Sequence, residues 1–254
     1  MPPALLLARA ATLEARRSGL PWLACGLLAA TLGLAAFLSQ VALIEGRELE
    51  AAATAALLRA GGVFLLATHI ASSVARESSD KVLELALALP LSRRAYYLGK
   101  LGGYGAVGLA LAAFYALPLL LWCPAPAVAL WGISFALELL LVAAATLFFA
   151  MTLASVLPAM AASVGLYLLG RTIASIQLLA HGPLSEEGWT QTLSRWAVDG
   201  VAYLLPRLGA ATRSEWLLYG APPAGEYGLV LLSLAAYGAL LLAAGLFDFQ
   251  RRNL

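Results

Sequence analysis

The chain has 254 residues, of which 62% are hydrophobic and 12% charged, and its mean hydropathy is +0.86. An ordinary soluble domain has about a quarter charged residues, and a water-soluble core of this size cannot hide so much apolar surface. The formal net charge of +2 is too small to indicate a nucleic-acid partner, since the basic residues form no single tract interleaved with aromatic residues. The composition therefore predicts a protein that resides in the lipid bilayer.

Six windows of the sequence are long and apolar enough to cross a bilayer, which needs roughly 20 mostly apolar residues. They are Leu/Ala-rich blocks without the period-2 alternation of membrane strands, so helices are predicted. The windows cover 20–44, 54–75, 95–122, 127–157, 159–180 and 227–247. The second is the weakest, because Arg59 and His69 lie near its two ends. We expect an all-α polytopic membrane protein with a single transmembrane domain over residues 1–254.

The segment before the first span, residues 1–19, is predicted to be a helix that lies in the membrane surface. Within ALLLARAATLEARR at 4–17, one helical stripe is apolar and another contains Arg9, Thr12 and Arg16. A frayed start to the first span is the alternative. The apolar run that follows is longer than the roughly 7–15 residues of a signal-peptide core, so we expect the first span to be retained.

The densest charge in the chain lies between the second and third spans, in RESSDKVLELALALPLSRRAYYLGK at 76–100. Residues 80–89 are predicted to form a short amphipathic helix with Val82, Leu85 and Leu89 on one face. Pro90 ends this helix and Ser92 caps the next one. The segment is either an ordinary interfacial loop or a handle for a cytoplasmic partner, and these features alone leave both possibilities open.

Four ionisable residues lie inside the expected spans, where charge is costly. They are Arg59, His69, Glu138 and Arg171. The first hypothesis is a neutralising pair of Glu138 with Arg171. The alternative for Arg59 and His69 is that each simply reaches a membrane interface. Structural roles are favoured over substrate contact for all four.

Two smaller features concern packing inside the spans. Cys25 and Cys123 are predicted to be inert apolar packing residues rather than a disulfide or a metal pair. The start of the third span, GKLGGYGAVG at 99–108, contains glycines that permit close approach of a neighbouring helix or of a second copy of the chain.

The connection at 181–226 is long and only partly polar. Its piece WAVDGVAYLLPRL at 196–208 is apolar but too short to cross, and Pro206 interrupts it. This predicts a re-entrant or interfacial helix pair on the outer side. A small outer cap that packs on the helix ends is the alternative.

Lysine and arginine fall on one side of the expected bundle. The basic residues of the start, of the connection between the second and third spans and of the end are Arg9, Arg16, Arg17, Arg76, Lys81, Arg93, Arg94, Lys100, Arg251 and Arg252. On the other side, EGRELE at 45–50 is net acidic and CPAPA at 123–127 is uncharged. Because cytoplasmic connections are enriched in lysine and arginine, both termini and residues 76–94 are predicted to be cytoplasmic.

The pattern ARESSDKVLELALALPLSRRAYYLGKLGG at 75–103 resembles the cytoplasmic loop of type-2 ABC exporter permeases. That family shows an acidic-basic stretch, a Leu-rich short helix, an LP-S-R corner and a Y-LGK start of the next span. The matching residues here are Glu77, Asp80, Lys81, Leu83, Glu84, Leu85, Leu89, Pro90, Ser92, Arg93, Tyr97, Leu98, Gly99 and Lys100. The basic first helix, the six spans, the outer apolar piece and the tail FDFQRRNL are similar too.

This resemblance implies a permease subunit in a bacterial inner membrane, without a catalytic centre of its own. It implies pairing with a second copy or a homologous subunit, and an ABC ATPase subunit on the cytoplasmic face that holds ATP and magnesium. The resemblance assigns the contact with that ATPase to Glu77, Asp80, Lys81, Val82, Leu85, Leu89, Pro90, Arg93 and Arg94.

The chain itself lacks the sequence of a phosphate-binding loop, which is G-x-x-x-x-G-K-[ST]. Its only Gly-Lys pair, Gly99-Lys100, is followed by Leu101, and Arg94 stands where the first glycine is required. We therefore expect no enzyme activity and no cofactor in this chain, and ATP hydrolysis in a partner.

Other functions are weighed against the exporter. A membrane protease is disfavoured because the residues around Ser134 do not match a nucleophile motif, and His69 and His181 alone cannot form a metal site. A secondary transporter working without ATP usually contains internal repeats and broken helices, and no repeat is evident here. A third possibility is an ABC-linked subunit that powers a periplasmic assembly or a metalloenzyme-maturation system. The sequence does not separate this from export of a cargo.

Overall fold

The structure is a computed structural model that describes residues 3–41, 46–80, 92–153, 155–181, 189–211, 215–218, 220 and 223–251. Every element in these ranges is helical. In chain order they are α1 (Pro3–Arg17), α2 (Leu20–Val41), α3 (Gly46–Ser79), α5 (Arg93–Ala116), the 3-10 helix η1 (Leu117–Leu121), α6 (Ala125–Leu153), α7 (Val156–Ala180), α8 (Trp189–Leu204), α9 (Leu208–Ala211), α10 (Glu215–Leu218) and α11 (Ala224–Arg251).

Six helical stretches among the described residues are long and apolar enough to cross a membrane, namely α2, α3, α5 with η1, α6, α7 and α11. These six helices match the six windows predicted from hydropathy, so the prediction of six apolar helices long enough to span a membrane is confirmed. The second window, the weakest in the sequence, is the longest helix. Its 34 residues measure about 51 Å, more than the roughly 30 Å of a hydrocarbon layer, so α3 extends beyond that layer.

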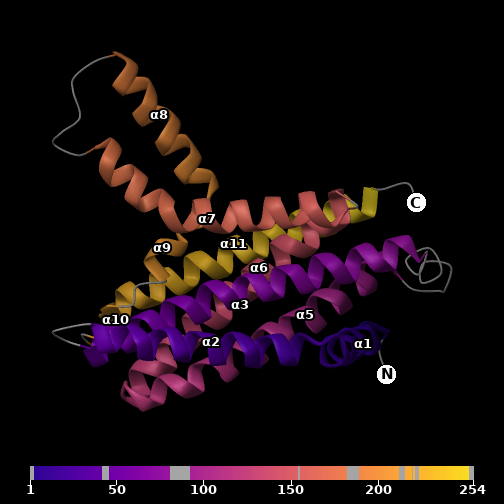
Figure 1. Cartoon of the computed structure of the whole chain (residues 1–254). Helices are drawn as coiled ribbons and strands as arrows, with labels where there is room; N and C mark the ends of the chain where they lie inside the picture. The colour runs from indigo at the N-terminus through magenta and orange to yellow at the C-terminus, as the bar shows by residue number, and fades with distance from the viewer. Residues whose placement is uncertain are drawn as a thin grey trace.

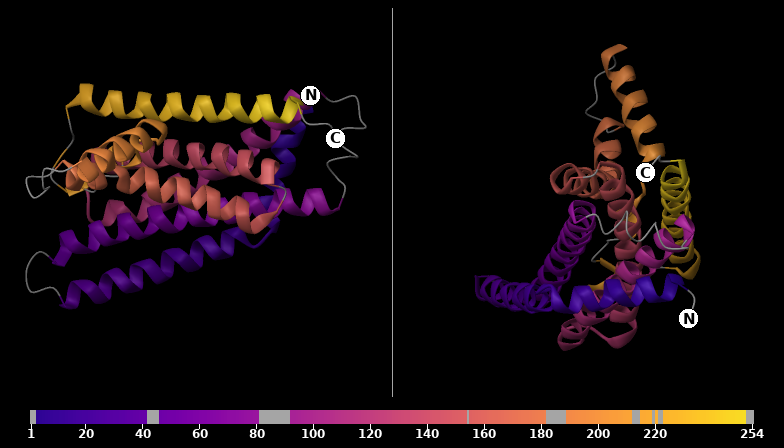
Figure 2. Two further views of the ribbon diagram at one scale, coloured as in Figure 1. Left: turned by 90° about the horizontal axis from the view of Figure 1, so that it is seen from above. Right: turned by 90° about the vertical axis from the view of Figure 1, so that its right-hand side faces the viewer.

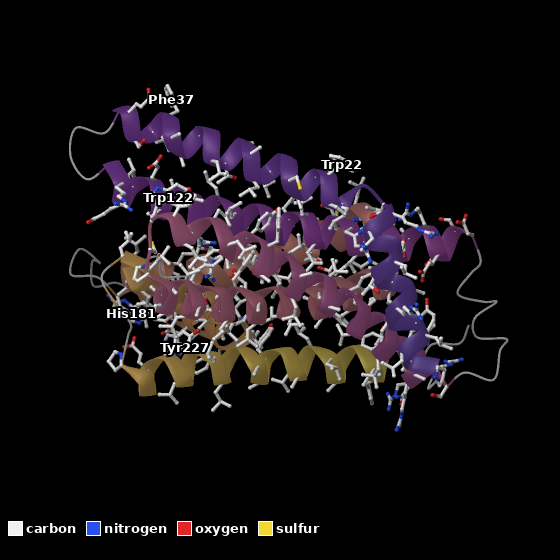
Figure 3. The ribbon with its side chains drawn as sticks, turned by 90° about the horizontal axis from the view of Figure 1, so that it is seen from below. Trp22, Phe37, Trp122, His181 and Tyr227 are labelled. Atoms are coloured by element: carbon white, nitrogen blue, oxygen red, sulfur yellow. The ribbon has the colours of Figure 1, made fainter. Side chains whose placement is uncertain are left out.

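The long helices run side by side along one axis (Figure 1), with α6 in the middle. In α6, 67% of the most apolar window is buried, compared with 11% in α11, so α6 is central and α11 peripheral. Large apolar side chains on the peripheral helices remain exposed, and Trp22 and Phe37 point away from the bundle (Figure 3). Because water does not tolerate so large an apolar exterior, this surface suits lipid.

Polar contacts define two ends of the bundle. At one end, Arg93 donates to the carbonyl of Gln250 at 3.2 Å, which joins the start of α5 to the end of α11. At the other end, Trp122 Nε1 donates to Glu50 at 3.0 Å, next to the start of α3. We call the first the inner end, because it carries α1 and the connection predicted to be cytoplasmic, and the second the outer end.

The helix α1 crosses the inner end transverse to the long helices (Figure 2) and packs on α5. A Cβ atom added at Gly103 would lie 2.6 Å from Ala11 Cβ and 2.7 Å from the carbonyl oxygen of Ala8. A Cβ at Gly99 would lie 2.8 Å from the carbonyl oxygen of Ala4. Two of the glycines predicted to allow close helix approach, Gly99 and Gly103, therefore pack directly against α1.

The outer segment contains α8, which pairs with the end of α7, and this hairpin leaves the bundle at its outer end (Figures 1 and 2). Gln177 on α7 donates to Asp199 on α8 at 3.0 Å. At 16 residues, or about 24 Å, α8 is too short to span. Its exposed aromatic residues recur every seven positions, at Trp189, Trp196 and Tyr203. The predicted helical segment is present, and its position in the bilayer stays a prediction.

The orientation can be tested by cysteine labelling in a chain whose two native cysteines are replaced by alanine. Ser79 is exposed at the inner end and Ser194 is exposed on α8. We expect a membrane-impermeant maleimide to label Ser79→Cys only in inside-out vesicles and Ser194→Cys only in right-side-out vesicles. The opposite pattern would place the inner end outside the cell.

Candidate functional site: the inner loop base and a buried charge pair

The segment predicted to grip a partner begins at the end of α3 and ends at the start of α5. Part of its predicted set lies outside the described residues: Lys81, Val82, Leu85, Leu89 and Pro90. The remaining members lie on the two stems: Glu77, Asp80, Arg93 and Arg94. Ser92 accepts a hydrogen bond from the backbone N–H of Ala95 at 3.2 Å, so the predicted cap of the third span is confirmed.

Glu77 joins the two stems. Its carboxylate forms an ion pair with the buried Lys100 and accepts a hydrogen bond from Tyr96 Oη at 2.8 Å. Both partners are in the first turns of α5, whereas Glu77 is in the last turn of α3. The electrostatic attraction within an ion pair is stronger when the pair is shielded from water. The end of α3 and the start of α5 are therefore held together by Glu77.

A second polar network ties α1 to this base. Glu14 on α1 pairs with Arg76 at 3.0 Å and accepts a hydrogen bond from Ser73 at 2.8 Å. Ser73 in turn accepts a hydrogen bond from Tyr104 on α5 at 2.9 Å. The three helices α1, α3 and α5 are therefore connected at the inner end by hydrogen bonds as well as by packing. Sequence reasoning missed this network, because the partners are far apart in the chain and only ordinary polar residues take part.

A fully buried ion pair joins α3 and α6 in the interior of the bundle. Arg59 Nη1 lies 2.7 Å from Glu138 Oε2, and the side chains are 2% and 0% exposed. Both residues lie 13 positions after the first residue of their helix, α3 and α6, which is about 20 Å from the outer end. They thus meet at the same depth. Arg59 does not reach an interface, contrary to the alternative considered for it.

Both Nη groups of Arg59 make further hydrogen bonds. Its Nη2 donates to Ser134 Oγ at 3.0 Å and to the carbonyl of Trp131 at 3.3 Å, and Nη1 reaches the carbonyl of Ala211 at 3.4 Å. The guanidinium carbon lies 4.9 Å from the Trp131 ring centre and 5.4 Å from that of Phe135. One side chain of α3 therefore holds α6 and the short outer helix α9 together.

The predicted pair of Glu138 with Arg171 is wrong. Arg171 Nη1 donates instead to Tyr167 Oη at 2.7 Å, one turn earlier on α7. Tyr167 lies close enough to Glu138 to interact with it electrostatically, so the two charges are neighbours through a tyrosine. Within the described part of the chain, the buried Glu138 Oε1 has no hydrogen-bond partner.

His69 lies near the inner end, where α1 turns into α2. Its Nδ1 is 3.5 Å from Ser18 Oγ, and its ring meets Tyr104 edge-on with 6.1 Å between ring centres. The Nε2 atom is buried and has no hydrogen-bond partner among the residues that the structure describes. The side chain packs between helices, at the level of the Glu14 network.

Both cysteines are free thiols. Cys123 is buried at the outer end, and this burial raises the pKa of its thiol, whereas the nearby Arg47 acts in the opposite direction. A thiol with a raised pKa is a poor nucleophile at neutral pH. Cys25, in contrast, is exposed on α2.

No family model matches the chain, and no curated protein is similar to it at a significant level.

Proposed function

We propose that this chain is the membrane-spanning permease subunit of an ABC transporter that works as an exporter. A separate ATPase subunit binds its inner end and hydrolyses ATP, and two permease copies form the translocation path between them. The observation that carries the proposal is the pattern at 75–103, because its stems lie on two adjacent spans and are joined by Glu77. If a partner is to move the spans by binding the connection between α3 and α5, the two ends of that connection must be fixed to each other, because otherwise only the connection would move.

The contacts at the inner end support a mechanical role for this segment. Glu77 binds both Lys100 and Tyr96, and Arg93 binds the end of α11. A displacement of the connection would therefore act on α3, α5 and α11 together, and the Glu14 network would pass it to α1. Packed helices respond to such a load by switching between discrete arrangements rather than by bending.

The proposed mechanism also needs helices that move together as a rigid unit, and the buried Arg59–Glu138 pair provides one. Arg59 fixes α3 to α6 and to α9, so these elements are expected to move as one body. In this proposal the pair does not touch the cargo, and the moving surface is the one between two copies of the chain.

The proposal is tested by isolating the tagged protein from its native membranes in mild detergent. We expect a copurifying polypeptide that is photolabelled by 8-azido-ATP and hydrolyses ATP. Replacing Val82, Leu85 and Leu89 by aspartate is expected to reduce its recovery at least tenfold, because the apolar face that the sequence predicts for docking would carry three charges.

The control places aspartate at Leu83 and Leu87, which lie on a different face of the same predicted helix. Recovery of the ATPase should then stay within twofold of the unaltered protein. Equal loss in both variants would mean that general polarity matters and not the face. A native complex without any nucleotide-binding subunit would overturn the proposal.

A further inference from the structure

An apolar groove of about 300 Å³ opens between α2 and α5 next to α1. Small side chains on both walls keep it open, among them Ala24 on α2 and Ala106 and Ala110 on α5. Cys25, expected from the sequence to be inert packing, is exposed on its wall. Figure 3 views the molecule from the side on which α1, α2 and α5 lie.

The rim of the groove at the inner end is basic. Thr12 and Arg16 of α1 line it, and Arg9 lies on the same helical stripe, where its carbonyl accepts a hydrogen bond from Thr12. Glu14, the one acidic residue of α1, is bound to Arg76 and Ser73 on α3 and does not offset this charge. Arg16 is exposed, so its guanidinium is available to an anion.

The depth of the groove matches one leaflet. Along α5 its lining runs from Ala106 to Phe114, which is about 12 Å of helix. Half of a hydrocarbon layer measures roughly 15 Å. Near the deep end, Tyr115 Oη donates to the carbonyl of Ala24 at 3.2 Å and links α5 to α2. The groove therefore accommodates an apolar chain that starts at the level of the basic rim and ends inside the same leaflet.

We propose that this groove is a binding site for one anionic phospholipid of the inner leaflet. Its phosphate binds Arg16, and one acyl chain lies between α2 and α5. Lipids around the convex surface exchange freely, whereas a concave apolar site with a cation at its rim retains one molecule. The inference rests on the placement of α1 at the inner membrane surface and does not require an ATPase partner.

The bound lipid would stabilise the position of α1 and α2. The direct packing of α2 is chiefly on α3, and that of α1 is chiefly on α5. A lipid in the groove contacts α1, α2 and α5 at once. We therefore expect it to raise the thermal unfolding temperature of the protein in detergent.

The test is native mass spectrometry of the delipidated protein, titrated with phosphatidylglycerol or with phosphatidylcholine of the same acyl chains. We expect one phosphatidylglycerol to be retained and Arg16→Gln to weaken its binding about five-fold, since a basic residue at the membrane surface contributes about 1 kcal/mol. Arg17→Gln is the matched control, because Arg17 is exposed on α1 and does not line the groove. Equal retention of both lipids, or equal effects of the two substitutions, would overturn the proposal.

The position of the acyl chain is tested on the chain with Cys123→Ser, in which Cys25 is the only thiol. We expect phosphatidylglycerol to slow the reaction of Cys25 with N-ethylmaleimide at least tenfold, and phosphatidylcholine at the same concentration to have little effect. In the mass spectra, Ala106→Trp should remove the retained lipid. Ala113→Trp, two turns further along α5 and outside the groove, should keep it. Unchanged reactivity of Cys25 with lipid bound would place the lipid elsewhere.

Discussion

Replacing Glu138 by leucine is expected to lower the free energy of unfolding by about 3–5 kcal/mol, the range for breaking a buried ion pair on one side. The carboxylate is fully buried, and its removal leaves the Arg59 guanidinium charged inside the bundle. The neighbouring Ser134 hydroxyl and Trp131 carbonyl bind that guanidinium but do not neutralise it. Unfolding by sodium dodecyl sulfate in mixed micelles, followed by circular dichroism, measures the loss.

The double variant Arg59→Met/Glu138→Leu distinguishes the pair from simple packing. Removal of both charges should restore most of the stability, because apolar replacements of a buried pair are often neutral or stabilising. Arg171→Gln is the control and should cost about 1 kcal/mol, since it removes one hydrogen bond to Tyr167 at a partly buried position. A double variant as unstable as Glu138→Leu alone would show that the pair is not what makes the single change harmful.

Replacing Gly103 by valine is expected to detach α1 from α5. A Cβ at this position would approach Ala11 Cβ to 2.6 Å and the backbone carbonyl of Ala8 to 2.7 Å, which is shorter than real contacts allow. Backbone cannot yield as a flexible side chain does, so the helices must separate, and overpacking of this kind costs about 1–3 kcal/mol. Faster tryptic cleavage at the arginines of α1 measures the detachment.

Gly102→Val is the matched control for that substitution. It places the same β-branched residue one position earlier on α5, where the nearest atom to an added Cβ is Ala8 Cβ at 3.9 Å. The helix-propensity change is the same at both sites, about 0.5 kcal/mol or less, so only the contact with α1 differs. Equal cleavage rates in the two variants would mean that the close approach does not hold α1 in place.

Much of the fold follows from hydropathy because a membrane span is a strong signal. The six windows became six helices, and Ser92 indicated the N-terminus of α5 correctly. The limits of α3 were harder to predict, since Arg59 and His69 lower the local hydropathy. A membrane helix tolerates polar residues when neighbouring helices supply hydrogen-bond or packing partners. A hydropathy average over one window contains no information about those partners.

The candidate site was predicted less well. The sequence provides two cations for Glu138 within neighbouring spans, and the choice of Arg171 was wrong. Depth decides between them, because Arg59 and Glu138 lie at equal offsets from the outer ends of helices that run in the same direction. That comparison needs helix boundaries, and the hydropathy windows placed the starts of the second and fourth spans with unequal errors. The Glu14 network depends on the transverse course of α1, for which the sequence offers no distance information.

The pairing of Arg59 with Glu138 has a consequence for biosynthesis. The two residues are 79 positions apart in the chain, so a ribosome working at about 5–20 residues per second makes the carboxylate roughly 4–16 s after the arginine. An arginine without a partner is energetically costly at the centre of a bilayer. The helix containing it is therefore expected to wait beside the insertion machinery until α6 emerges, and α3 and α6 would enter the lipid as a preassembled pair rather than one by one.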